Sequence, residues 1–323
     1  MDSLADLLDD RSFQAAVAYS GIGFVVITVV ASVRVWGRRP PLGGFVLVAA
    51  TLAALGGLGP AKSVGNLPPE LFIGLGVLAA TGIALEWFRP PLVVTMAALL
   101  PGAWIVGLAL DGVGPDWSRP LLVTFTAIGG ALVADTDRYQ ERRGFGPALL
   151  AITIVGVYGT VPDTEHARVL LGAALPLLFL GIPTPVAKLG VGGSATSVAL
   201  IMWIATVDGV GRPAAIVGSA GAFAILLAEP LGRRAFSRLR QKVRRKNHTL
   251  ARHLVVVTDV TLLHAVLALY ASRVAGFSDT TAAAVWLLVP MLAVAFVAAG
   301  TFPPPPRPRK ARPRRGHGIV LDR

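Results

Sequence analysis

Two ionisable residues in an apolar stretch near the C-terminal end could do proton chemistry. Asp259 and His264 lie within residues 253–274, with no arginine inside one helical turn of either residue. In a helix that begins at residue 253 and crosses a bilayer, Asp259 lies about 9 Å and His264 about 16 Å from the start, and about 140° separates them around the axis. A carboxylate and an imidazole at such depth are typical of a proton relay or an ion-coupling site. The alternative is a neutral pair that hydrogen-bonds to neighbouring helices.

Three more carboxylates stand at the ends of apolar stretches. Glu86, Asp135 and Glu229 are each followed three or four residues later by an arginine. This spacing puts acid and base on one helix face, where the arginine compensates a carboxylate near a helix C-terminus. In the competing functional interpretation, Glu86 and Glu229 line a cytosolic vestibule and bind a proton or a cation. Pro230 after Glu229 favours this second interpretation, because a proline frees backbone carbonyls that can line a cavity.

A glycine-rich segment offers backbone amides to an anion. Its candidate residues are Lys188, Gly190, Gly192 and Gly193, which open an apolar stretch. Glycines at a helix start expose N–H groups, and the lysine adds positive charge, so the segment suggests an anion-binding site. A plain helical turn is the alternative, since the segment matches neither a P-loop nor a dinucleotide fingerprint.

Asp135 and Asp137 are the one metal-site candidate. With Glu141 behind them, they resemble the Asp-x-Asp arrangement that holds a metal and a diphosphate. An enzyme of that kind generally needs a second set of carboxylates, which the predicted cytosolic loops do not offer. The five histidines lack metal-ligand spacing, and the absence of cysteine excludes thiol nucleophiles and cysteine metal sites. No cofactor is expected.

Long apolar stretches must position all of these residues. The chain has 323 residues, 54% of them hydrophobic and 15% charged, and a mean hydropathy of +0.67. Ordinary soluble domains carry about 25% charged residues, so a water-soluble globular enzyme is excluded. The composition predicts an all-α integral membrane protein with about 11 transmembrane helices, since about 18 apolar residues cross a hydrocarbon core. The predicted spans are 13–36, 42–59, 70–87, 92–110, 120–135, 146–162, 167–183, 190–207, 213–231, 253–274 and 280–300.

The charges of the loops predict the orientation. Of the 30 lysine and arginine residues, 24 fall on one alternate set of loops and the C-terminal tail, while the opposite loops carry most of the acids. Positive flanks resist translocation, so the N-terminus is predicted outside and the C-terminus in the cytosol. Residues 1–12 are then an extracytoplasmic N-terminus and 13–300 a multi-pass domain of the inner membrane. The excess of arginine over lysine, in a background rich in alanine, glycine and proline, favours a bacterial source.

After the first span the chain is organised as five hairpins that leave and return to the same side. Asp111-Gly112-Val113-Gly114 before Arg119-Pro120 is echoed by Asp208-Gly209-Val210-Gly211 before Arg212-Pro213. The echo suggests a parallel hairpin repeat, although tight membrane turns need these residue types in any case. Small residues within the spans predict close helix packing. They occur at Gly56-Gly57, Gly74-Leu75-Gly76, Gly129-Gly130, Gly192-Gly193 and Gly218-Ser219-Ala220-Gly221.

Two basic segments are predicted on the cytosolic side. Residues 233–252 carry nine lysine or arginine residues and no acid, as expected of an amphipathic helix on anionic lipids. Residues 301–323 form a Pro/Arg-rich tail that is predicted to be disordered. The expected partners are the lipid bilayer and anionic lipids, with a homo-oligomer or a protein partner left open. Nucleic acid is not expected, because no aromatic platform accompanies the basic residues.

Three function classes fit these observations. The favoured one is a transporter or channel-like permease with Asp259 and His264 as coupling residues. The second is a membrane-embedded enzyme that acts on a lipid-linked substrate at the cytosolic face through Asp135 and Asp137. The third is a non-catalytic assembly subunit whose basic loop and tail dock partners. The sequence specifies no substrate, coupling ion or transport direction.

Overall fold

The computed structural model describes residues 4–32, 41–58, 67–139, 145–160, 164–181, 188–209, 216–217 and 219–222. Within these ranges the regular structure is helical and contains no strand. Asp259, His264 and Glu229 lie outside the described residues. So do the basic loop 233–252, the tail 301–323, most of the predicted span 213–231 and the whole of the last two predicted spans.

Each of the first eight predicted spans coincides with a helical segment. The helices are α1 (Leu4–Asp9), α2 (Arg11–Ser32), α3 (Gly43–Leu55), α4 (Pro69–Phe88), α5 (Leu92–Leu108), α6 (Ser118–Thr124), α7 (Gly130–Tyr139), α8 (Phe145–Thr160), α9 (Glu165–Gly181) and α10 (Gly190–Asp208). A π-helical turn, η1 (Phe125–Gly129), joins α6 to α7, and the three together make the fifth predicted span. The all-helical prediction is confirmed for the described part of the chain.

Three of the described helices are long and apolar enough to cross a membrane. They are α2 over Arg11–Val30, α4 over Pro69–Phe88 and α10 over Gly190–Asp208. Shorter apolar helices cover Gly43–Leu55, Leu92–Leu108 and Ser118–Ala134. The count of eleven spans stays a prediction.

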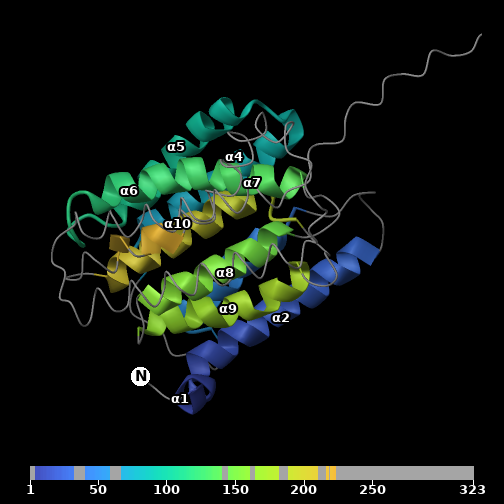
Figure 1. Cartoon of the computed structure of the whole chain (residues 1–323), viewed down its shortest axis with the longest axis vertical. Helices are drawn as coiled ribbons and strands as arrows, with labels where there is room; N and C mark the ends of the chain where they lie inside the picture. The colour runs from blue at the N-terminus through green and yellow to red at the C-terminus, as the bar shows by residue number, and fades with distance from the viewer. Residues whose placement is uncertain are drawn as a thin grey trace, which may run out of the picture.

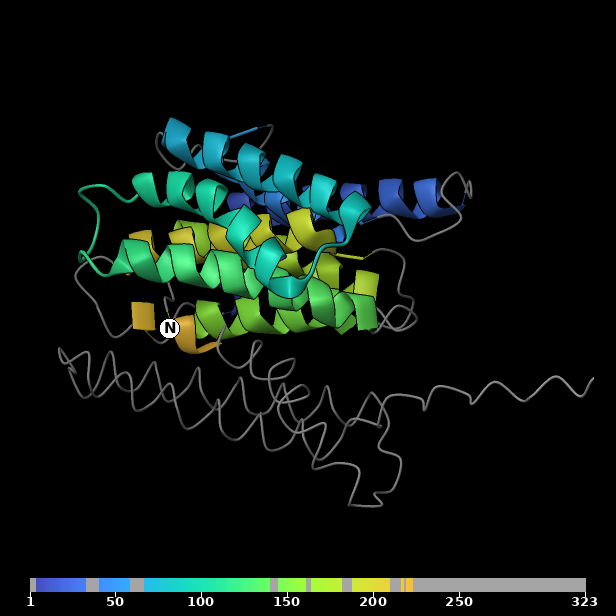
Figure 2. The ribbon, with the colours of Figure 1, turned by 90° about the horizontal axis from the view of Figure 1, so that it is seen from above.

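The helices lie alongside one another in a bundle, with α10 in its interior (Figures 1 and 2). Every residue of α10 from Gly190 to Thr206 is buried. Its main neighbours are α3, α4, η1 and α7. A helix that is buried on all sides needs packing partners on every side, so α10 is the central helix of the bundle.

The first predicted hairpin is not a packed pair. α3 packs against α2, α9 and α10, whereas α4 packs against α5 and α10. Both α3 and α4 pack against α10. On each of these helices, α10 covers the surface that the other member of the predicted hairpin would have covered. The expected hairpin is therefore wrong as a packed pair for α3 and α4, whereas α8 and α9, which form the third predicted hairpin, do pack against each other.

Glycines set these close approaches. A Cβ atom on Gly44 of α3 would lie 2.4 Å from the carbonyl carbon of Gly193, and one on Gly82 of α4 would lie 2.1 Å from the Cα atom of Gly192. A Cβ atom on Gly130 of α7 would lie 2.7 Å from the Cα atom of Ala195. Lipid gives little hydrophobic drive between helices, so contacts of this kind supply the dispersion energy that holds them together. The predicted packing role is confirmed for Gly130, Gly192 and Gly193.

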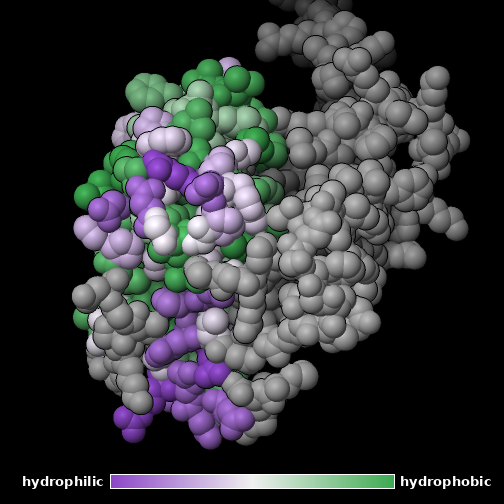
Figure 3. Space-filling view, turned by 90° about the vertical axis from the view of Figure 1, so that its left-hand side faces the viewer, coloured by the Kyte–Doolittle hydropathy of each residue, from purple (hydrophilic) through white to green (hydrophobic). Residues whose placement is uncertain are grey.

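The loops gather at two opposite ends of the bundle. At one end, named here the Asp208 end, α10 ends close to where α9 begins, and α1 lies nearby (Figure 1). At the other, named the Lys188 end, the Gly43 N–H donates to the Lys188 carbonyl over 2.9 Å. Figure 3 looks onto the Asp208 end and shows hydrophilic residues gathered there beside strongly hydrophobic ones. The orientation of the chain in a membrane stays a prediction.

Large apolar side chains are exposed mainly on α2, α4 and α5. On α2 the exposed stripe is Ile22, Val25, Val26, Val29 and Val30. On α4 and α5 the exposed side chains are Phe72, Ile73, Ile83, Trp87, Phe88, Val93, Val94, Leu100 and Trp104. Exposed apolar side chains gathered on helices of this length are compatible with contact with lipid or with protein.

Candidate functional site

Glu86 caps the first turn of α10. Its Oε1 atom accepts a hydrogen bond from the backbone N–H of Val191 over 2.8 Å. The first N–H groups of a helix have no partner within the helix and carry a partial positive charge, so a carboxylate is stabilised there. The sequence placed Glu86 at the end of its own helix and did not reveal this partner.

The structure brings two predicted sites together at this point. Glu86 contacts the Val191 N–H at the helix start that follows Lys188 and Gly190, and an anion-binding site at this segment stays a prediction. Gly192 and Gly193 face α4 and α3 in the close contacts described above. Gly190 has a φ of +70°, a left-handed conformation that glycine adopts without strain. An anion from outside the chain would have to share or displace the position of Glu86.

The two predicted metal ligands lie in one helix. Asp135 and Asp137 both belong to α7. Positions two residues apart are separated by about 200° around a helix axis, so α7 places them on different faces. Among the described residues no group of three or more histidine, cysteine or acidic residues could hold a metal ion. A metal site at these aspartates stays a prediction.

A polar cluster at the Asp208 end was missed by the sequence analysis. The Thr164 hydroxyl donates to Oδ2 of Asp208 over 2.5 Å, and Nδ1 of His166 lies 2.8 Å from Oδ1 of the same carboxylate. The Asp208 side chain is only 4% exposed. The ring of His166 meets that of Trp203 edge to face, with centroids 6.0 Å apart. A carboxylate, an imidazole and an indole therefore converge where α9 begins and α10 ends.

The local sequence explains why Asp208 takes these partners. A carboxylate at a helix C-terminus faces the negative end of the dipole and needs donors from elsewhere. Thr164 supplies one donor, and its Oγ1 atom also accepts from the Ala167 N–H over 3.3 Å, so the same hydroxyl caps α9. His166 supplies the second donor from the first turn of α9.

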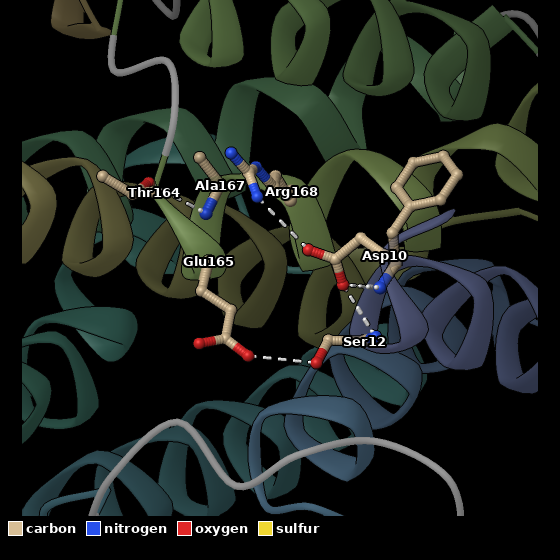
Figure 4. A network of polar contacts seen from close by, with 7 residues as sticks. Asp10, Ser12, Thr164, Glu165, Ala167 and Arg168 are labelled. Atoms are coloured by element: carbon tan, nitrogen blue, oxygen red, sulfur yellow. Dashed lines mark hydrogen bonds and ion pairs between the residues drawn. The ribbon is translucent and has the colours of Figure 1, made fainter. Parts of the chain in front are cut away.

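A second network ties the start of α2 to the start of α9 (Figure 4). Asp10 accepts from the backbone N–H groups of Ser12 and Phe13 over 2.8 and 3.1 Å, which caps α2. The other oxygen of Asp10 lies 3.4 Å from Nη1 of Arg168, and the Ser12 hydroxyl donates to Glu165 over 3.0 Å. The starts of α2 and α9 are thus joined by polar side chains.

Some buried polar atoms have no hydrogen-bond partner in the described part of the chain. They include Oγ of Ser194 and Nε1 of Trp203 on α10, and Oγ1 of Thr126 in η1. π-helical turns occur frequently at functional sites, and each unpaired buried polar group in a native structure needs an explanation.

Comparison with known proteins found no match to a protein-family model and none to a curated protein. The function must be argued from the site. The signal that could have found the missed cluster was topological: residues 163–168 and 208–212 belong to neighbouring loops on the same predicted side. His166 lacks metal-ligand spacing, and that criterion does not detect a histidine whose partner is an aspartate from another helix.

Proposed function

We propose that this chain is a multi-pass inner-membrane protein of a bacterium and acts as a transporter or channel-like permease. Asp259 and His264 are its coupling residues, and Glu229 lies on the cytosolic part of the pathway. In this proposal Glu86 has a structural role, because it caps the start of α10. The proposal rests on one observation: α10 is buried throughout and yet carries a polar side chain without a hydrogen-bond partner among the described residues.

α10 is buried from Gly190 to Thr206, and two of its polar side-chain atoms have no hydrogen-bond partner among the described residues. It is long enough to cross a membrane, it is enclosed on all sides, and its Ser194 hydroxyl has no hydrogen-bond partner in the described part of the chain. Leaving a buried donor or acceptor unpaired costs about 1–3 kcal/mol. Such a cost is explained if the hydroxyl faces water or a substrate in a pathway next to the central helix. Thr126 in η1 supplies a second hydroxyl of this kind.

The exposed surface supports membrane embedding. α4 has 20 residues and is about 30 Å long at 1.5 Å per residue, close to the thickness of a hydrocarbon core. Trp87 and Phe88, which are 83% and 82% exposed, lie at the Lys188 end of α4. Trp104 lies toward the Asp208 end of α5, with the Arg119 guanidinium 4.2 Å from its ring centroid. Aromatic residues at both ends of an apolar surface are typical of the two membrane–water interfaces.

Thiol accessibility tests the proposal, because the chain has no native cysteine. We expect Ser194→Cys, Asp259→Cys and His264→Cys, reconstituted in lipid vesicles, to react with a small water-soluble thiosulfonate reagent. Ser197→Cys is the matched control. Ser197 lies on the same helix and is equally buried, but its hydroxyl donates to the Gly44 carbonyl over 3.3 Å. A pathway along the Ser194 side predicts much faster labelling of Ser194→Cys than of Ser197→Cys.

The opposite result would contradict the permease proposal. If Ser194→Cys, Asp259→Cys and His264→Cys all react as slowly as Ser197→Cys in the folded protein, no water-filled pathway reaches these positions. The assembly-subunit and enzyme alternatives would then be tested instead, by deleting residues 302–323 and by Asp135→Asn.

A further inference from the structure

The carboxylate of Asp208 fixes the ring of His166. One oxygen of Asp208 lies 2.8 Å from Nδ1 of His166, and the other accepts from Thr164. An ionised carboxylate only accepts hydrogen bonds, so the contact requires a proton on Nδ1. In the neutral ring, Nε2 then carries a lone pair. The arrangement is that of an orienting acid behind a histidine that accepts a proton at its far nitrogen.

The far nitrogen is available. No hydrogen bond to Nε2 of His166 occurs among the described residues, and the side chain is 17% exposed at the Asp208 end. Trp203 covers the ring by an edge contact and does not pair with it by hydrogen bonding. Water at this end of the bundle can therefore reach the imidazole.

The charged neighbours of His166 along α9 contact residues other than His166. Glu165 and Arg168, on the same helix as His166, contact Ser12 and Asp10. Asp10 comes from the turn between α1 and α2 and also caps α2. Asp208 of α10 is the charged group that contacts His166 in the described part of the chain. Among the described residues, one acid and one imidazole thus form a pair without a third charged partner.

We infer that His166 is a proton-binding site at the Asp208 end of the permease, with Asp208 as its positioning residue. This inference rests on the proposed function and names the proton as a coupling ion. A hydronium ion gives its proton to Nε2, water leaves, and the resulting imidazolium is balanced by the Asp208 carboxylate. A hydrogen bond between a carboxylate and a neutral imidazole at the end of α10 becomes an ion pair, so the uptake of a proton acts directly on the central helix.

Nitrogen NMR of the full chain, labelled with ¹⁵N-histidine and held in lipid bilayers, tests the inference. The chain has five histidines, and His166→Gln identifies the signals of His166 by their loss. We expect a neutral His166 ring with its proton on Nδ1, which becomes an imidazolium when the sample is acidified. Asp208→Leu is expected to abolish the preference for Nδ1. Asp208→Asn offers an amide that can donate to Nδ1 as well as accept from it, so it is also expected to weaken the preference for a proton on Nδ1.

Glu165→Gln is the matched control, since it neutralises the adjacent carboxylate and leaves Asp208 in place. It is expected to leave the His166 spectrum unchanged. A wild-type ring with its proton on Nε2, or a ring that does not take up a proton at any pH at which the protein stays folded, overturns the inference. Failure of the permease proposal gives a different pattern: Ser194→Cys stays unlabelled while His166 shows the expected tautomer and titration.

Discussion

The carboxylate of Glu86 on α4 holds the backbone N–H of Val191, the second residue of α10, at 2.8 Å. A group predicted to face a vestibule thus caps the central helix of the bundle. The partial positive charge of that helix start, which could have bound a substrate anion, is balanced within the protein.

Removing this cap should weaken the fold. Replacing a capping side chain by alanine costs about 0.5–2 kcal/mol, so Glu86→Ala should lower the free energy of unfolding in mixed micelles by about 1 kcal/mol. Glu86→Gln keeps an acceptor oxygen and should lose less. Asp116→Ala, which removes an exposed carboxylate at the other end of the bundle, is the control. Equal stability of Glu86→Ala and the wild type would show that the contact does not contribute.

Gly82 and Gly76 should respond oppositely to alanine. A Cβ atom at Gly82 would lie 2.1 Å from Gly192 Cα, whereas one at Gly76, on the same helix, would have no atom within 4 Å. Gly82→Ala must push α4 away from α10 and should cost about 1–3 kcal/mol or more. Gly76→Ala should be neutral or slightly stabilising, because alanine favours a helix over glycine by about 1 kcal/mol. Unfolding in mixed micelles measures both, and similar effects of the two substitutions would argue against the α4–α10 contact.

The predicted orientation can be checked across α5. Asp111 follows α5 and its side chain is 61% exposed, while Arg89 is exposed just before that helix begins. A membrane-impermeant maleimide should label Asp111→Cys in right-side-out vesicles and Arg89→Cys in inverted ones. Labelling of both from one side would mean that α5 does not cross the membrane. An exchange of the two sides would reverse the orientation and place His166 in contact with the cytosol.

Asp10 should stabilise α2 mainly as a cap. It accepts two backbone hydrogen bonds, and its contact with Arg168 is 3.4 Å long. Asp10→Ala should therefore cost about 1 kcal/mol. Asp10→Asn keeps a capping oxygen and loses the ion pair. It should lower the free energy of unfolding by only about 0.3 kcal/mol, because partly exposed ion pairs contribute about 0–1 kcal/mol. If Asp10→Asn were as unstable as Asp10→Ala, the pair with Arg168 would carry the effect.

The helices could be predicted from the sequence because their cause is local. In lipid a segment must satisfy its own backbone hydrogen bonds, so each long apolar stretch becomes a helix whatever surrounds it. The eight apolar stretches between residues 13 and 207 all coincide with helical segments in the structure. The turns between the helices could be predicted as well, because proline, glycine and charged residues separate the apolar stretches. Close packing at Gly130, Gly192 and Gly193 was also predicted, although their partners were not.

Only the tertiary structure decided which helix is central and which polar groups meet. α10 is the least apolar of the three membrane-length helices, so hydropathy does not mark it as the most buried. Burial depends on how many neighbours a helix has, and this is set by glycine contacts such as Gly82 with Gly192 between distant segments. The sequence determined that Glu86 and Asp208 stand at helix ends. Their partners, Val191 and His166, lie 105 and 42 residues away along the chain, and only the folding of the bundle brings them within hydrogen-bond distance.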